Sequence, residues 1–197
     1  MKKVLLLGDS IRQNYQEYVK KELVEADVYY TNDNGRFSSF MLRYLHEWIN
    51  AISEHGKFSF DIIHFNCGLW DVLRLSNDQL PITDINVYTE LLERIIMRLR
   101  YLCPEAKLIF ATSTSVIEPG FEPGVDIGER RNCDIEDYNN AACMVCEKMD
   151  VWVDDLWSVS VNLPESAHSD LVHYDTEIGI KTLGDQVISV IRNCCEG

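Results

Sequence analysis

Short apolar runs alternate with longer amphipathic stretches along most of the chain. The runs that have the length of strands are Lys3–Gly8, Asp27–Tyr30, Asp61–Asn66, Lys107–Thr112 and Val151–Asp154. The first, third and fourth are almost continuously apolar, as expected of strands covered by helices on both faces. The stretches between them carry apolar residues at helical spacing. They predict helices over Gln13–Glu25, Phe37–Ser53, Asp84 to just before Pro104, Asp134–Met149 and Thr176–Arg192.

This alternation predicts an α/β fold, namely a flavodoxin-like three-layer α/β/α sandwich around a five-stranded parallel sheet. Ligands of such sheets bind at the carboxyl ends of the strands. A length of 197 residues fits a single domain spanning residues 1–197. The one long irregular segment, Thr114–Cys133, is rich in glycine, proline and charge. Segments of this kind often cover a functional site.

Charge and targeting signals narrow the possible partners. The formal net charge of −14 disfavours nucleic acids and anionic membranes as partners. The apolar run Val4–Leu7 is shorter than the core of a signal peptide, and no apolar run approaches the roughly 20 residues of a membrane span. We therefore expect a cytoplasmic protein. Its seven cysteines, an odd number, are expected to be reduced thiols.

The segment Gly8-Asp9-Ser10 directly follows the first predicted strand. A serine at a strand-to-helix turn is presented at the edge of the sheet, and backbone N–H groups of the turn can stabilise an oxyanion. Serine and aspartate are also favoured helix N-caps. The tripeptide alone therefore leaves a nucleophile and a simple cap equally open.

A possible base for that serine stands near the other end of the chain, in Asp170-Leu171-Val172-His173. A nucleophilic serine needs a base to accept its proton, and the base needs a carboxylate to orient it. Asp170 and His173 are three residues apart, so one turn can hold both in contact. His168, Asp170 and His173 could also be metal ligands, but they lack the close helical spacing of zinc motifs, so we predict no metal site.

The combination of Gly-Asp-Ser after the first strand and Asp-x-x-His before the last helix resembles the SGNH (GDSL-like) hydrolase family. The resemblance implies that Ser10 is the nucleophile, His173 the base and Asp170 its orienting carboxylate. It also implies that the backbone N–H groups of Ser10 and Gly35 form part of an oxyanion hole, since Asn34-Gly35-Arg36-Phe37 matches the position of the family's second block.

The third block of the family usually reads Gly-x-Asn-Asp, and its asparagine side chain donates to the oxyanion. Here the segment reads Asn66-Cys67-Gly68-Leu69-Trp70-Asp71, so Trp70 occupies the place of the asparagine. We expect Asn66, at the end of the third strand, to supply the missing donor. Losing one such donor costs on the order of 3 kcal/mol of transition-state stabilisation.

The resemblance implies a serine ester hydrolase that works through an acyl-enzyme intermediate and needs no cofactor. We expect a small-molecule ester as substrate, with a small acyl group such as acetyl, on a carbohydrate-like alcohol. Arg12, Arg36 and Trp70 lie near the strand ends and are expected to face this substrate.

Two functions from other classes stay open on the sequence alone. A binding module that keeps the fold without activity would tolerate Trp70 at the asparagine position. A flavodoxin-like cofactor or phosphoacceptor domain would use Ser10 only as a helix cap, although Gly8-Asp9-Ser10 lacks the richer phosphate-binding loop of such domains.

Overall fold

The computed structural model describes residues 1–118, 122 and 126–196. Its centre is a parallel sheet built from β1 (Lys2–Leu7), β2 (Ala26–Tyr30), β3 (Ile62–Phe65), β5 (Lys107–Ala111) and β7 (Trp152–Asp154). The strand order is β2-β1-β3-β5-β7, and every neighbouring pair is parallel. This order reverses direction between β1 and β3, where ligand sites of such sheets form. The predicted five-stranded parallel sheet is confirmed.

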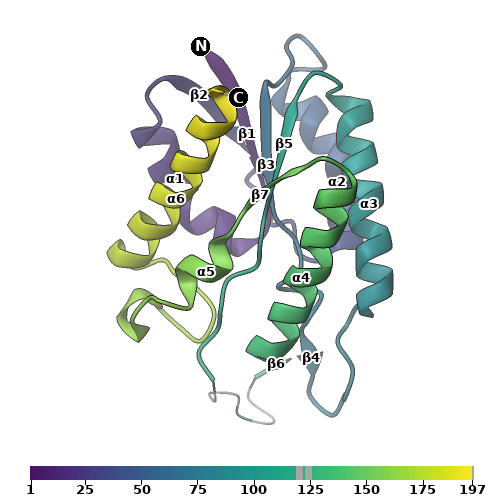
Figure 1. Cartoon of the computed structure of the whole chain (residues 1–197), viewed down its shortest axis with the longest axis vertical. Coiled ribbons are helices and arrows are strands. Elements are labelled where there is room, and N and C mark those ends of the chain that lie inside the picture. Colours follow the sequence, from purple (N-terminus) through teal and green to yellow (C-terminus); the bar gives the residue numbers. More distant parts are fainter. Residues whose placement is uncertain (119–121, 123–125, 197) are drawn as a thin grey trace.

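Helices cover both faces of this sheet, which confirms the three-layer α/β/α sandwich (Figure 1). On one face lie α1 (Ser10–Glu22) and α6 (Glu177–Glu196), and on the other lie α2 (Ser38–Ile52), α3 (Ile85–Leu102) and α4 (Asn132–Lys148). The strands are buried because both of their faces are covered; all four residues of β3 are buried. Among the described residues, no helix is long and apolar enough to cross a membrane.

The first helix begins earlier than the apolar pattern predicts, at Ser10 instead of Gln13. Asp9 is its N-cap, and the Asp9 side chain accepts a hydrogen bond from the N–H of Ile11 at 3.0 Å. The cap adds a first turn whose one apolar residue, Ile11, is too little to show helical periodicity. This turn places Ser10 at the carboxyl end of β1.

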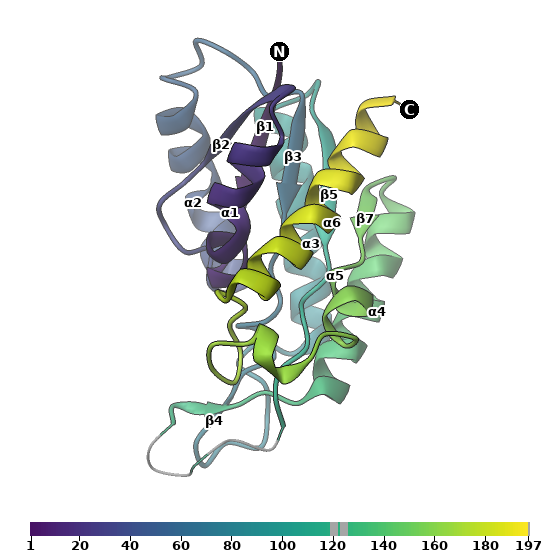
Figure 2. The ribbon, with the colours of Figure 1, turned by 90° about the vertical axis from the view of Figure 1, so that its left-hand side faces the viewer.

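Three short elements were not predicted from the sequence. A two-stranded antiparallel ribbon joins β4 (Arg74–Leu75) to β6 (Gly128–Glu129), which lies within the expected irregular segment Thr114–Cys133. Helix α5 (Leu156–Ser160) and a 3₁₀ turn (Glu165–Ala167) follow β7. Each is too short to show periodicity. The ribbon extends beyond the carboxyl ends of the sheet strands (Figures 1 and 2). Part of the expected loop, residues 119–121 and 123–125, lies outside the described residues.

A buried polar network ties β3, β7 and α6 together. The Nε2 atom of His64 lies 2.9 Å from Oδ2 of Asp154, and both side chains are fully buried. The other Asp154 oxygen accepts a hydrogen bond from Gln186 Nε2 at 2.9 Å. Buried polar groups are tolerable only when they are paired, so the Asp154 carboxylate is the common acceptor on which this network depends.

We predict that Asp154→Ala lowers the free energy of unfolding by about 3 kcal/mol, because it leaves His64 and Gln186 facing an unpaired buried site. Urea denaturation followed by circular dichroism measures the change. Asp27→Ala, at an exposed position on β2, is the matched control and should change stability by less than about 0.5 kcal/mol. Equal effects of the two substitutions would show that the Asp154 network contributes nothing to stability.

Candidate active site

The side chains of Ser10, His173 and Asp170 form one continuous chain of hydrogen bonds. His173 Nε2 lies 2.9 Å from Ser10 Oγ, and His173 Nδ1 lies 2.7 Å from Asp170 Oδ2. The second carboxylate oxygen of Asp170 accepts the backbone N–H groups of Val172 and His173, each at 2.7 Å. The structure thus brings together three residues from opposite ends of the sequence in the order that a nucleophile, base and orienting carboxylate require.

The loop that carries His173 is anchored on both sides of the triad. The N–H of Ser169 donates to the carbonyl of His173 at 2.9 Å, which closes the loop on itself. The next residue, Tyr174, is fully buried, and its hydroxyl lies 2.8 Å from Ser115 Oγ. The N–H of Tyr174 also donates to Asn14 on α1 at 3.2 Å. These contacts fix the imidazole relative to the helix that begins at Ser10.

The surroundings of Asp170 and Asp9 shift the pKa values of these two carboxyl groups in opposite directions. Partial burial favours the neutral form of Asp170, but the hydrogen bonds from the His173 ring and from the N–H groups of His173 and Val172 outweigh it and lower its pKa. Asp170 is therefore a carboxylate at neutral pH. In contrast, complete burial raises the pKa of Asp9, and the side chain of Asn66 and the cation of Arg12 only partly oppose this rise.

The predicted oxyanion donors are not equally available. The N–H of Ser10 is at the first position of α1, and it has no acceptor among the described residues. The N–H of Gly35 is already donated to the carbonyl of Gly8 at 2.7 Å. Asn66 is 4% exposed, and a Cβ atom on Gly8 would lie 1.8 Å from its Oδ1, so the acceptor oxygen of its carboxamide packs beneath the Gly8-Asp9 turn. In this conformation the geometry offers the Ser10 N–H and does not offer Gly35.

The prediction that Arg12 faces substrate is wrong. Arg12 is fully buried, and its guanidinium donates to the backbone carbonyls of Thr31 at 2.8 Å, Gly8 at 3.2 Å and Asp33 at 2.6 Å. It also contacts the side chain of Gln16. These acceptors belong to the ends of β1 and β2, so Arg12 fastens the two strand ends together.

The two other residues expected near substrate lie at the rim. Arg36 is exposed, with Cζ 4.6 Å from the centroid of the Phe40 ring. Trp70 is half-buried and meets Phe37 edge to face, with ring centroids 6.2 Å apart. Both positions leave part of the side chain accessible beside the strand ends.

Comparison with solved structures links this geometry to known folds. No protein-family model matches the chain, and no curated protein matches its sequence. A lipase/acylhydrolase from Enterococcus faecalis superimposes with a TM-score of 0.72 at 19% identity, over 98% of this chain and 96% of that one. The acetyl xylan esterase AlAXEase gives 0.72 at 18% identity, covering 96% and 99% of the two chains. A carbohydrate esterase family 3 protein from Talaromyces cellulolyticus gives 0.71 at 16% identity, covering 100% and 99%.

The chain has the SGNH hydrolase fold. These likenesses span nearly the whole length of both partners, so they include the carboxyl end of β1, which Ser10 follows, and the loop before α6, which carries Asp170 and His173. At this level of identity they establish the arrangement of the chain. The chemistry has to be argued from the side chains.

The sequence reasoning missed one residue of the site, Arg130. Its Nε donates to the carbonyl of Leu69 at 2.6 Å, and its Cζ lies 5.9 Å from the centroid of the Trp70 ring. Burial lowers the pKa of Arg130, while the carboxylates of Asp9 and Asp170 oppose that shift. No sequence motif marks this arginine, because it lies in the irregular segment and only the β4–β6 ribbon brings it to the strand ends.

A cavity of about 560 Å³ lies beside the triad. Asp170 and Arg130 line it together with apolar residues of two segments, Val116, Ile117, Ile127, Leu171 and Val172. Acidic residues, Glu118, Asp126 and Glu129, also contribute to its wall. Its mixture of apolar and charged surface suits a small polar molecule that presents both hydroxyl groups and C–H surfaces.

Two other chemistries receive no support from the described part of the chain. His168 packs against the Tyr174 ring, with centroids 3.9 Å apart, and no group of three His, Cys, Asp or Glu side chains there could hold a metal ion. Cys67 is fully buried, and burial raises the pKa of its thiol well above the ordinary value. A thiol in that state is not a nucleophile at neutral pH.

We predict that Asp170→Asn slows the reaction of Ser10 with a serine-reactive phosphonate by about 10³- to 10⁴-fold, because an amide cannot hold the His173 tautomer that accepts the serine proton. Mass spectrometry of the labelled protein over time measures the rate. Asp175→Asn removes the same charge at an exposed position two residues beyond His173 and should react at nearly the wild-type rate. Equal rates for Asp170→Asn and wild type would remove Asp170 from the triad.

Proposed function

We propose that the protein is a serine ester hydrolase that removes a small acyl group, acetyl in the first instance, from a carbohydrate-like alcohol. The hydrogen-bonded chain Ser10–His173–Asp170 at the carboxyl end of β1 carries this proposal. An isolated helix cap would not need an imidazole 2.9 Å from its hydroxyl, nor a carboxylate behind that imidazole.

In the proposed reaction, Ser10 Oγ attacks the ester carbonyl carbon while His173 Nε2 takes its proton. Asp170 holds the Nδ1–H and stabilises the imidazolium that forms. The negative charge develops on the former carbonyl oxygen, towards which the Ser10 N–H at the start of α1 is available. Collapse of this intermediate breaks the ester C–O bond, and His173 gives its proton to the departing alcohol. A water molecule then attacks the acyl-enzyme with His173 again as base, and releases the acid and the free serine.

The substrate class rests on weaker support than the reaction type. Among the structures of the same fold, one is an acetyl xylan esterase and another belongs to a carbohydrate esterase family. The cavity beside Asp170 offers apolar and charged walls that suit the alcohol half of a sugar ester. The half-buried rings of Phe37 and Trp70 offer apolar surface near the site on which a sugar ring can pack.

We predict that wild-type protein hydrolyses p-nitrophenyl acetate faster than the butyrate and octanoate esters, and that it releases acetate from acetylated xylo-oligosaccharides. Ser10→Ala should abolish turnover and phosphonate labelling together, with a loss of at least about 10³-fold. Colorimetric release of p-nitrophenol and an acetate assay measure the two activities.

The matched control is Ser39→Ala, which removes an exposed hydroxyl from the first turn of α2 and should retain full activity. Turnover that persists in Ser10→Ala would overturn the nucleophile assignment. Wild-type protein without turnover or labelling would overturn the hydrolase and favour a binding protein that keeps the fold. A preference for octanoate would retain the hydrolase and reject the small acyl group.

A further inference from the structure

Of the two backbone N–H groups predicted for the oxyanion hole, only one has no acceptor among the described residues. The Ser10 N–H is available, but the Gly35 N–H is donated to the Gly8 carbonyl, and the carboxamide oxygen of Asn66 packs against the same turn. Trp70 stands where the family resemblance places a donating asparagine. One N–H alone is a weak counterpart for the full negative charge of a tetrahedral intermediate.

We propose that Arg130 is a catalytic residue that contacts the ester carbonyl oxygen and stabilises its negative charge in place of the missing carboxamide. This inference rests on the hydrolase proposed above. It assigns to the site a fixed cation instead of a second neutral donor.

The guanidinium of Arg130 has free donors where they are needed. Its Nε is used by the Leu69 carbonyl, one residue before Trp70, and its plane lies near the Trp70 ring. The two Nη atoms have no acceptor among the described residues, which leaves the four N–H bonds of the fork available. Arg130 also lines the cavity to which Asp170 contributes. The side chain therefore lies between Trp70 and the cavity that Asp170 lines, and its Nη atoms have no acceptor among the described residues.

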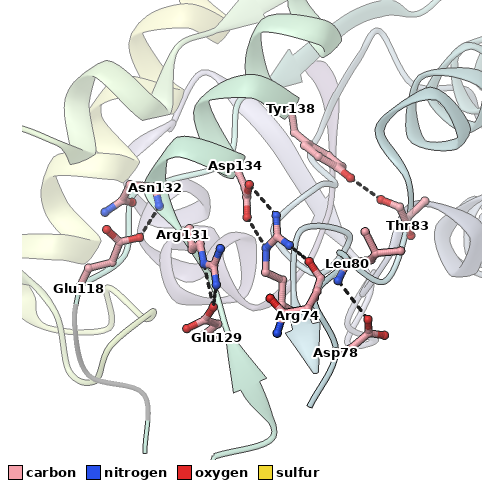
Figure 3. Close-up of polar contacts among 11 residues, drawn as sticks. Arg74, Asp78, Leu80, Thr83, Glu118, Glu129, Arg131, Asn132, Asp134 and Tyr138 are labelled. Atoms are coloured by element: carbon pink, nitrogen blue, oxygen red, sulfur yellow. Dashed lines mark hydrogen bonds and ion pairs between the residues drawn. The ribbon is translucent and has the colours of Figure 1, made fainter. Parts of the chain in front are cut away.

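The residues before and after position 130 are held by polar contacts, among them those of Arg74, Glu129, Arg131 and Asp134 (Figure 3). Residue 130 follows β6 directly and precedes α4, so the ribbon and the helix fix it from both sides. Arg74 on β4 contacts both the ribbon and the helix. Its backbone pairs with Glu129 of β6, and its side chain forms a bidentate ion pair with Asp134 in the first turn of α4, at 2.7 and 2.9 Å. Arg131, the next residue, turns to Glu129 instead of the site. Only Arg130 of this segment is left with its guanidinium fork free.

A cation at this position also fits the charge of the site. The carboxylates of Asp9 and Asp170 both act on Arg130, so the neighbourhood of the reacting carbonyl is otherwise negative. An oxyanion that forms beside these carboxylates is disfavoured unless a positive group offsets them. Charge-assisted hydrogen bonds in a partly buried site are roughly twice as strong as neutral ones.

The test compares Arg130→Met, Arg130→Lys and wild type on phenyl acetate, a neutral ester whose only hydrogen-bond acceptors are the two oxygens of the ester group. We expect kcat to fall about 10²-fold in Arg130→Met, with KM changed less than about threefold. Arg130→Lys should recover part of the loss, because it restores the charge without the fork. Rates are compared on the plateau of the pH profile, so that the variants differ only in the rate of the chemical step.

Chemical rescue separates catalysis from a merely structural role. Guanidinium chloride at up to about 0.1 M, below its denaturing range, should raise the kcat of Arg130→Ala saturably and leave wild type unchanged. Arg94→Met, which removes an exposed arginine from α3, controls for the loss of one positive charge and should keep the wild-type kcat. Circular dichroism checks that each variant is folded.

The possible results divide cleanly. An unchanged kcat in Arg130→Met would overturn the role of Arg130, and so would a fall in kcat that guanidinium does not rescue in Arg130→Ala. In both cases, turnover that depends on Ser10 would still uphold the hydrolase. A rise in KM confined to esters that carry a carboxylate would show that Arg130 binds substrate anions and would also overturn the proposal. If wild type has no turnover on any ester, both the hydrolase and the role of Arg130 fall.

Discussion

The backbone carbonyl of Gly8 is the point at which the segments around the nucleophile are joined. It accepts the Gly35 N–H from the segment after β2 and a guanidinium N–H from Arg12 on α1. The absence of a side chain on Gly8 lets Asn66, at the end of β3, pack against the same turn. The ends of three neighbouring strands are therefore locked together one residue before the Asp9 cap. The direction in which Ser10 points follows from this lock.

The same lock decides which donors the site can offer. A hydrogen bond that fixes the turn uses the N–H of Gly35, which the family resemblance assigns to the oxyanion. Stability of the turn and stabilisation of a developing charge thus compete for the same group. The guanidinium of Arg130 lies next to Trp70, with its Cζ 5.9 Å from the ring centroid, and among the described residues it takes no part in the contacts of the turn.

The second half of the triad depends on helix packing instead of strand ends. The loop of His173 precedes α6, which packs on α1, and the hydroxyl of Tyr18 on α1 accordingly lies 2.7 Å from Asp185 on α6. Buried Tyr174 then ties the loop to the segment after β5. The buried Asp154 carboxylate, through Gln186, holds α6 to the sheet. These separate contacts together hold His173 Nε2 2.9 Å from Ser10 Oγ, although none of them involves the two reacting atoms.

The chain by itself determined the layers, the five-stranded parallel sheet and the three candidate residues Ser10, His173 and Asp170. Continuous apolar runs at the strands and helical spacing between them leave few alternatives to a doubly covered parallel sheet, because each pattern fits only one period. Ser10, Asp170 and His173 could be found because their local spacing carries their chemistry. The early start of α1 could not be found, because the single apolar residue of its first turn, Ile11, does not by itself mark a helical period.

Only the tertiary structure decided the roles of the arginines and the state of the oxyanion donors. Arg12 and Arg130 are both arginines near polar segments in the sequence, yet Arg12 is fully buried among backbone carbonyls and Arg130 keeps its fork free beside Trp70. Two acceptors of Arg12, the carbonyls of Thr31 and Asp33, lie 19 and 21 residues away in sequence, and the acceptor of Arg130, the carbonyl of Leu69, lies 61 residues away. The direction of a long charged side chain is set by such distant acceptors. No periodicity or motif in the chain encodes them.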